Sequence, residues 1–168
     1  DGNMVIKWVY DIIVDDNSDP KIVDFENFPG LNCPYTEVYF TKEGKGAGYA
    51  RNVGIDHAVG KWLIFADADD YFNSSFNEAL DVFIIDDSDI VFFKTNSIFL
   101  NDNTISTRGK YINDRIDIAK KDQNYDLLLY ATPPPWAKFI RKEIIDSNKI
   151  YFKESLWAND VHFSTMVG

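Results

Sequence analysis

The sequence predicts an α/β domain: a mostly parallel open sheet flanked by helices, with a small mixed or antiparallel addition toward the C-terminus. The first observation is the run 62–66 (WLIFA), whose unbroken hydrophobicity is typical of a strand covered on both faces. The second is the alternation of strand and helix patterns up to Phe93, after which the pattern becomes mixed. With 168 residues, 45% of them hydrophobic, the chain can bury a sizeable core as one domain.

Turn and cap signals delimit the expected elements. Pro29-Gly30 marks a turn, Gly60 has the position of a left-handed cap after a helix, and Ser75-x-x-Glu78 has the form of a capping box. A proline run at 133–135 ends the helix before it. We expect strands at 11–14, 37–40, 62–66, 89–94 and 136–140, a hairpin at 97–100 and 104–107, and helices at 50–58, 75–83, 115–130, 142–148 and 159–166.

The N-terminal apolar stretch is too long for a single strand. Residues 4–9 and 11–14 are expected to be two strands whose connecting helix is not in this sequence. The single domain expected over 1–168 is therefore incomplete at the N-terminal end of its sheet, in its first strand and helix, and is expected to be truncated at the C-terminus. The second of the two strands leads into Asp15 and Asp16.

Three carboxylates, those of Asp67, Asp69 and Asp70, follow the run 62–66 directly. In an open parallel sheet, ligands bind just beyond the carboxyl ends of the strands. Like charges this close repel each other, and a divalent cation such as Mg²⁺ or Mn²⁺ would offset the repulsion. The acids alone fit a solvated turn equally well.

Gly44, Gly46 and Gly48 alternate with other residues just before the helix expected at 50–58. Such a loop lets the backbone approach a ligand closely, although the spacing differs from GxGxxG and a flexible turn is the alternative. Arg51 lies in the first turn of that helix, near the loop. The acids after two strands and this loop can all reach one edge of the sheet, so the sequence predicts a nucleotide site there.

Composition excludes several classes of function. The formal charge of −10 argues against general nucleic-acid binding, because phosphates would be repelled. No apolar run approaches the roughly 20 residues of a membrane span, and no signal peptide is visible. The lone Cys33 excludes an internal disulfide and is compatible with a reducing, cytoplasmic compartment.

The stretch GAGYARNVGIDHAVGKWLIFADADDYF (46–72) resembles the centre of family 2 glycosyltransferases, with its Ala-Arg-Asn helix, Gly turn and strand ending in Asp-x-Asp. DIIVDDNSD (11–19) resembles the family's second strand and its Asp-Asp-Gly-Ser turn, with Asn17 at the usual Gly, a residue that tolerates left-handed geometry. The distal block of the family, in which a Glu-Asp pair opens a helix, is similar to segments 136–142, 150–152 and 159–163. The resemblance implies the GT-A (Rossmann-like) fold.

The resemblance also implies an inverting, metal-dependent reaction in polysaccharide or glycoconjugate synthesis. A sugar would pass from a nucleotide-diphosphate sugar, expected to be a UDP-sugar, to a hydroxyl of a saccharide or lipid-linked acceptor. Asp160 would be the general base, and Asp69, with Asp67, would hold Mn²⁺ or Mg²⁺ at the diphosphate. The residues implied in nucleotide binding are Asp16 at the base, Asp67 at the ribose, and Asp15, Gly46 and Arg51.

Several residues keep two interpretations. His162 is a further metal ligand or an ordinary helix residue, and we favour the second. Trp136 and Lys138 are the candidate residues on the acceptor side. Trp136 offers a flat face to an acceptor sugar or belongs to the core, and Lys138 pairs with a phosphate or is simply solvated. Asn159 stands where the family usually has a glutamate, which removes a charge beside Asp160.

Two other functions stay open. A nucleotidyltransferase also uses paired acids with metal and nucleotide, although the chain has no basic triphosphate loop. A non-catalytic module that binds a sugar nucleotide would fit Asn159 and the missing first strand. Without targeting signals we expect a cytoplasmic enzyme with no nucleic-acid partner, and the resemblance implies peripheral association with the inner face of a membrane.

Overall fold

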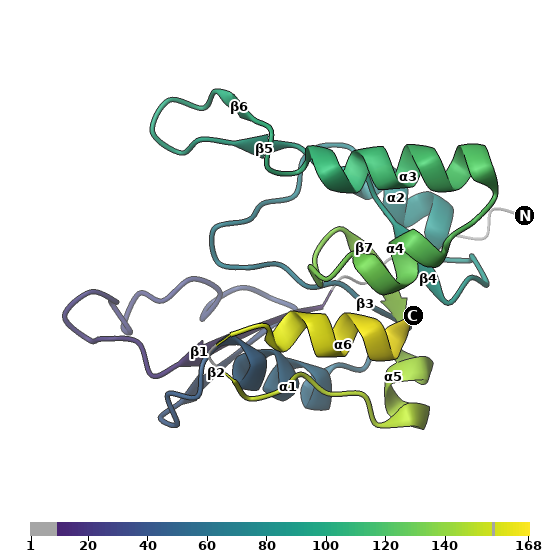
Figure 1. Ribbon diagram of the computed structural model, residues 1–168. Helices are drawn as coiled ribbons and strands as arrows, with labels where there is room; N and C mark the ends of the chain where they lie inside the picture. The colour runs from purple at the N-terminus through teal and green to yellow at the C-terminus, as the bar shows by residue number, and fades with distance from the viewer. Residues whose placement is uncertain (1–9, 156) are drawn as a thin grey trace, which may run out of the picture.

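The computed structural model describes residues 10–155 and 157–168, so the strand expected at 4–9 lies outside the described residues (Figure 1). The strands are β1 (Asp11–Asp16), β2 (Thr36–Thr41), β3 (Trp62–Leu63), β4 (Ile90–Phe92), β5 (Ser97–Ile98), β6 (Ile105–Ser106) and β7 (Lys138–Arg141). The helices are α1 (Ala47–His57), α2 (Phe76–Phe83), α3 (Lys110–Asp122), α4 (Asp126–Ala131), α5 (Lys142–Asn148) and α6 (Asn159–Val167).

The described strands form three small sheets. β1 and β2 pair in parallel, in a register that runs from Asp11 opposite Thr36 to Asp16 opposite Thr41. β7 lies between β3 and β4 and is antiparallel to both, while β5 and β6 form a hairpin. The α/β class and the antiparallel C-terminal addition are confirmed. Parallel pairing within the described residues is confined to β1 and β2, because β7 enters the second sheet from the opposite direction.

β3 is shorter than the strand predicted at 62–66. It pairs with β7 through two residues only, and the chain then leaves the sheet. Phe65 turns its ring toward Phe152 and Phe163, with ring centres 5.3 and 5.6 Å apart and nearly perpendicular planes. The predicted extent is wrong because packing of aromatic rings, instead of further strand pairing, buries this part of the run.

Two clusters of buried side chains form the core. The larger one collects α1, β3, β7, α5, α6 and the segment after α5: Ile55, Leu63, Ile140, Ile145, Ile150, Phe152, Phe163 and Val167. The smaller one lies between α3 and α4: Ile112, Ile116, Ala119 and Leu128, with Phe92 and Trp136 packed against it. Because β7 supplies Ile140 to the larger cluster and its neighbour β4 supplies Phe92 to the smaller, these two strands join the clusters.

Helix ends and caps differ from the predicted ones, and α1 and α3 begin earlier than predicted, at Ala47 and Lys110. The amide of Ala58 donates back into the last turn of α1, which ends there without using Gly60 as its cap. Ser75 has helical backbone angles and makes no side-chain cap bond, so the capping box does not form. The helix predicted at 115–130 is two helices, α3 and α4, because Gln123 adopts a left-handed conformation with φ of 54°. Helices α2, α5 and α6 and the hairpin are confirmed.

The elements that carry the predicted site residues end on one side of the molecule (Figure 1). β1 and β2 run toward the left of the view, and α1 (blue) and α6 (yellow) both begin there. The segment between β3 and α2, which carries the predicted acids, loops out on the same side. Within the described ranges, no helix combines the length and the apolar character that crossing a membrane requires.

Candidate active site

Asp16, the last residue of β1, holds the glycine loop that precedes α1. Its carboxylate accepts hydrogen bonds from the Thr41 hydroxyl and from the amides of Gly44 and Gly46, at 3.0 and 2.7 Å for the two amides. Burial would raise the pKa of Asp16, but these bonds together outweigh it and lower the pKa below its usual value. The structure therefore brings Asp16 at the end of β1 and the glycine loop together, as predicted.

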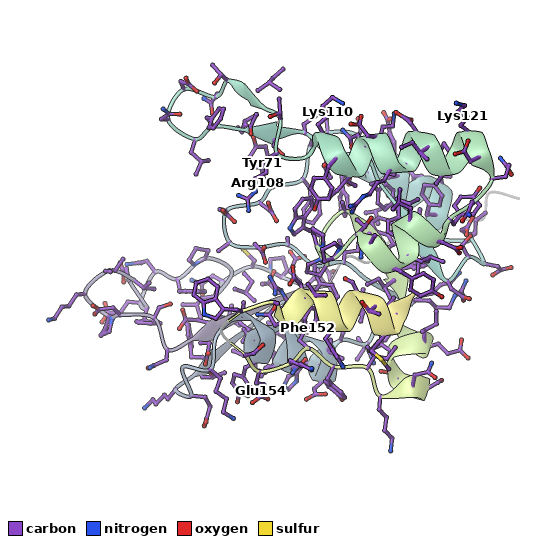
Figure 2. All side chains as sticks on the ribbon, in the orientation of Figure 1. Tyr71, Arg108, Lys110, Lys121, Phe152 and Glu154 are labelled. Carbon is purple, nitrogen blue, oxygen red and sulfur yellow. The ribbon has the colours of Figure 1, made fainter. Side chains whose placement is uncertain are left out.

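The glycine loop meets two different requirements. Gly46, directly before α1, has φ of 90° and ψ of −172°, a conformation that residues with a side chain rarely adopt. Gly48 lies within the helix, but a Cβ there would be 2.3 Å from the carbonyl oxygen of Lys153. Lys45 adds an ion pair of 3.4 Å with Glu154. The loop and the first turn of α1 are therefore packed against the segment that precedes α6, where Figure 2 labels Phe152 and Glu154.

Arg51 in α1 joins the two halves of the predicted site. Its Nη1 donates to Oδ1 of Asn159 at 3.0 Å, and its Nη2 forms an ion pair with Asp67. The guanidinium also lies 5.3 Å from the ring centre of Phe152. The Arg51 side chain is only 15% exposed, and shielding from water strengthens these charged contacts. Arg51 thus links the segment after β3 to the start of α6.

Asn52, the next residue in α1, is a positioning residue that pattern reasoning misses. Its buried side chain donates to the carbonyl of Phe152 at 2.9 Å and accepts from the amide of the same residue at 2.8 Å. An asparagine inside a helix is unfavourable unless its side chain finds a partner. The presence of Asn beside Arg51 in the helix pattern is therefore the one signal that could have revealed this contact.

The acids after β3 form a tight turn. Asp70 accepts a hydrogen bond of 3.0 Å from the amide of Asp67, which is itself paired with Arg51. Asp69 is exposed, and within the described part of the chain no hydrogen bond or ion pair engages it. Among the described residues, no three potential ligands converge as a metal-binding group. One or two carboxylates completed by substrate phosphates suffice for Mg²⁺, so Asp69, with Asp67, fits an ion that binds together with a nucleotide.

Asp160, the predicted base, is the second residue of α6 and is half-buried. Ala158 turns the chain into the helix with a left-handed φ of 54°, and Asn159 is held by Arg51. A carboxylate in the first turn of a helix is stabilised by the helix dipole. Arg51 thus contacts both Asp67 and the residue next to Asp160.

Lys138 is buried, so its interpretation as a solvated lysine is wrong. The residue is 3% exposed, and its Nζ donates to the carbonyl of Thr132 at 2.7 Å and to Oγ of Ser164 at 3.1 Å. Burial lowers the pKa of Lys138 to about 8, although the charge of Asp160 opposes this shift. β7 is the middle strand of its sheet, which explains why its first side chain is enclosed.

The remaining predicted residues have simpler surroundings. Asp15 is buried and accepts a hydrogen bond of 3.2 Å from the amide of Ser18, so it stabilises the turn after β1. Asn17 in that turn has the predicted left-handed conformation, with φ of 63°. Trp136 is half-buried against the smaller core cluster, and His162 is exposed on α6. Nucleotide contact by Asp15 and acceptor contact by Trp136 stay predictions, as does the favoured interpretation of His162 as an ordinary helix residue.

Sequence comparison relates the chain to proteins named as glycosyltransferases. Residues 12–156 match Glycosyl transferase family 2. The chain is 27% identical to the glycosyltransferase YibD of Escherichia coli (strain K12) over 160 residues, which are 92% of this chain and 46% of YibD. It is 34% identical to the glycosyltransferase RC0461 of Rickettsia conorii over 74 residues, which are 44% of this chain and 11% of that protein. The match to this chain therefore spans about half the length of YibD and a smaller share of RC0461.

Solved structures share the fold. TarS residues 1–349 from S. aureus in complex with UDP-GlcNAc superposes with a TM-score of 0.65 at 23% identity, over 93% of this chain and 43% of that chain. The same TarS segment in complex with UDP gives a TM-score of 0.63 at 26% identity, over 91% of this chain and 44% of that chain. The implied GT-A fold is confirmed by these superpositions, and the family match covers most of the sequence. The chain belongs to glycosyltransferase family 2.

Proposed function

We propose that this chain transfers a sugar from a UDP-sugar to an acceptor hydroxyl, with inversion at the anomeric carbon and with a divalent Mn²⁺ or Mg²⁺. The observation that carries the proposal is Arg51, which contacts Asp67 on one side and Asn159, beside Asp160, on the other. This contact supports a single site, in which Asp67 on the donor side lies near the start of α6, the helix that carries Asp160. The TarS complexes with UDP-GlcNAc and UDP favour a uridine nucleotide as the donor.

In the proposed reaction, the acceptor oxygen forms a bond to the anomeric carbon while the bond from that carbon to the diphosphate oxygen breaks. Asp160 takes the hydroxyl proton as the new bond forms, because a sugar hydroxyl is a poor nucleophile. UDP leaves with the electron pair of the broken bond. Attack from the face opposite the leaving group produces the inversion.

The donor would be held by the loop and the acids that adjoin α1. Asp16 keeps the loop that precedes α1 in place through the amides of Gly44 and Gly46. Asp69, with Asp67, would hold the divalent ion, which when bound supplies positive charge that neutralises the departing diphosphate. Arg51 keeps the Asp67 carboxylate in place at the ribose.

Isothermal titration calorimetry of UDP, with and without Mn²⁺, tests the donor site. We expect UDP to bind in the presence of Mn²⁺, and Asp69→Ala to weaken that binding by about tenfold or more, because the divalent ion would lose the carboxylate that holds it beside the diphosphate. Asp102→Ala is the matched control, since it removes one exposed carboxylate from the β5–β6 hairpin. Absence of any UDP heat above buffer in the wild-type protein would contradict the proposal.

Asp160→Asn separates binding from transfer. The variant should bind UDP as tightly as the wild type but release UDP from a UDP-sugar about 10²- to 10⁴-fold more slowly, the range expected for a lost general base. The measurement is UDP release from a panel of UDP-sugars with Mn²⁺ and a panel of saccharide acceptors, which supply the hydroxyl that receives the sugar. If the wild type binds UDP and turns over none of them, a non-catalytic sugar-nucleotide module is favoured, in line with Asn159 as an uncharged partner of Arg51.

A further inference from the structure

The ring of Phe152 contacts both halves of the predicted site. Phe152, labelled in Figure 2, belongs to the segment between α5 and α6 and is 3% exposed. Its ring stacks on that of Phe163 in α6, with centres 3.8 Å apart and planes 9° from parallel, and meets the ring of Phe65 nearly at right angles at 5.3 Å. Phe65 is two residues before Asp67, and Phe163 is three residues after Asp160. One side chain thus contacts the two segments that carry the predicted acids and the predicted base.

Helix α1 contacts the same residue through two neighbouring side chains. Asn52 accepts from the amide of Phe152 at 2.8 Å and donates to its carbonyl at 2.9 Å, so the Phe152 backbone cannot shift along the helix without losing both bonds. The guanidinium carbon of Arg51 lies over the Phe152 ring, 5.3 Å from its centre. Because residues 51 and 52 are adjacent, the bonds to Asn52 fix the ring relative to the Arg51 guanidinium.

Arg51 differs from two other arginines that lie over aromatic rings. Arg115 and Arg141 are each 5.1 Å from a ring centre, and both donate to backbone carbonyls. Arg51 instead donates to the side chains of Asp67 and Asn159. Of these three arginines, the one on Phe152 is therefore the one whose orientation bears on the predicted site.

A flat ring suits this orientation better than an aliphatic side chain does. The guanidinium is planar and its Nη atoms lie in that plane, so a rotation of the group moves both Nη atoms away from their partners. The face of an aromatic ring attracts a cation, whereas a leucine in the same place offers no such attraction. The Arg51 side chain is 15% exposed, so little water competes with the ring.

We propose that Phe152 is a positioning residue for the transfer reaction: its ring holds the Arg51 guanidinium in the orientation that joins Asp67 to Asn159. The effect on transfer rests on the proposed function, whereas the hold on Arg51 does not. Without the ring, the guanidinium can rotate, and Asp67 loses the partner that keeps its carboxylate in place on the donor side. Phe152 itself need touch neither the donor nor the acceptor.

Nitrogen-15 NMR of the Arg51 guanidinium, identified by its loss in Arg51→Lys, tests the hold without any nucleotide. In the wild type, hindered rotation about the Cζ–Nε bond should give separate signals for the two Nη atoms, and averaged signals there overturn the inference. Phe152→Leu should average the two signals, and separate signals in this folded variant overturn the inference as well. Phe152→Tyr retains the ring and should keep the signals separate.

Phe139→Leu is the matched control. It makes the same change at a position in β7 that is 2% exposed, where the ring packs against those of Trp62 and Phe93. Thermal unfolding should show similar losses for Phe139→Leu and Phe152→Leu, because both remove a buried ring. The Arg51 signals should nevertheless stay separate in Phe139→Leu. Averaging there too would make Phe152 an ordinary core residue and overturn the inference.

Calorimetry with UDP and Mn²⁺ connects the hold on Arg51 to function. Phe152→Leu should weaken UDP binding by about three- to tenfold, because Asp67 is no longer held in place, whereas Phe139→Leu should bind UDP within about twofold of the wild type. If the wild type binds UDP and Phe152→Leu binds it equally tightly, the positioning role is overturned. If the wild type binds no UDP, the proposed function fails, and the NMR comparison still decides whether Phe152 holds Arg51.

Discussion

Two asparagine side chains each hold an extended segment against a helix. Asn52 in α1 pairs with both the amide and the carbonyl of Phe152, and Asn113 in α3 pairs in the same way with Thr95, at 2.8 Å for both bonds. A carboxamide offers one acceptor and a donor pair in a plane, so it can replace a neighbouring strand for a single residue. These contacts connect segments that share no sheet.

Replacing Asn52 should cost more stability than replacing Asn113. Asn52→Ala leaves the amide and carbonyl of the buried Phe152 unpaired, and we expect a loss of about 2–4 kcal/mol in the free energy of unfolding. Asn113→Ala acts on a half-buried partner that water can reach, so its loss should be about 1 kcal/mol. Urea unfolding measures both, and equal losses would contradict this assignment.

Helix α1 contains two glycines with opposite surroundings. A Cβ at Gly48 would be 2.3 Å from the carbonyl oxygen of Lys153, whereas a Cβ at Gly54 would meet nothing within 4 Å. Gly48 therefore allows the segment before α6 to lie directly on the helix. Gly54 has no such partner and only weakens the helix relative to alanine.

The same substitution at the two positions should act in opposite directions. Gly48→Ala should displace the segment around Lys153, reduce the free energy of unfolding by about 1–3 kcal/mol and weaken UDP binding, because Arg51 and Asn159 lose their alignment. Gly54→Ala should stabilise the protein by about 0.5–1 kcal/mol and leave UDP binding unchanged. Thermal unfolding and calorimetry provide the two measurements, and a stabilised Gly48→Ala would rule out the close approach.

Local patterns predict the type of most elements and the position of the donor-side residues. β1, β2, α1 and the turn with Asp67 were recoverable because hydrophobic runs, glycines and acids are local signals. The break at Gln123 was not, since a left-handed glutamine carries no glycine or proline signal. The burial of Lys138 and the bond from Arg51 to Asn159 also escape sequence reasoning, because they depend on segments distant in the chain.

The two core clusters meet at β4 and β7, and Lys138 lies at this junction. Lys138 links the end of α4 to α6. The next residue, Phe139, is 2% exposed, and its ring packs against the rings of Trp62, Phe76 and Phe93. A change in the charge of Lys138 therefore acts on the packing of both clusters. The free energy of unfolding of the whole domain should therefore depend on whether Lys138 is protonated.

Because of Lys138, the free energy of unfolding should rise as the pH is raised from about 8 to about 10.5. The folded pKa of Lys138 is lowered by burial from 10.5 to about 8, so in this window the unfolded chain binds the proton that the folded chain has lost. The contribution is about 3 kcal/mol across the window, and below pH 8 it does not vary. Urea unfolding of the wild type and Lys138→Met as a function of pH measures it, and parallel curves would contradict it.

The bonds from α1 to the distal segment span 100 residues for Asn52 with Phe152 and 108 for Arg51 with Asn159. During synthesis the helix emerges from the ribosome long before its partners, so the side chains of Asn52 and Arg51 meet only water at first. Closing such long loops slows folding, because their entropy is lost before the contacts form. The candidate active site should consequently be among the last parts of the nascent chain to acquire its native shape.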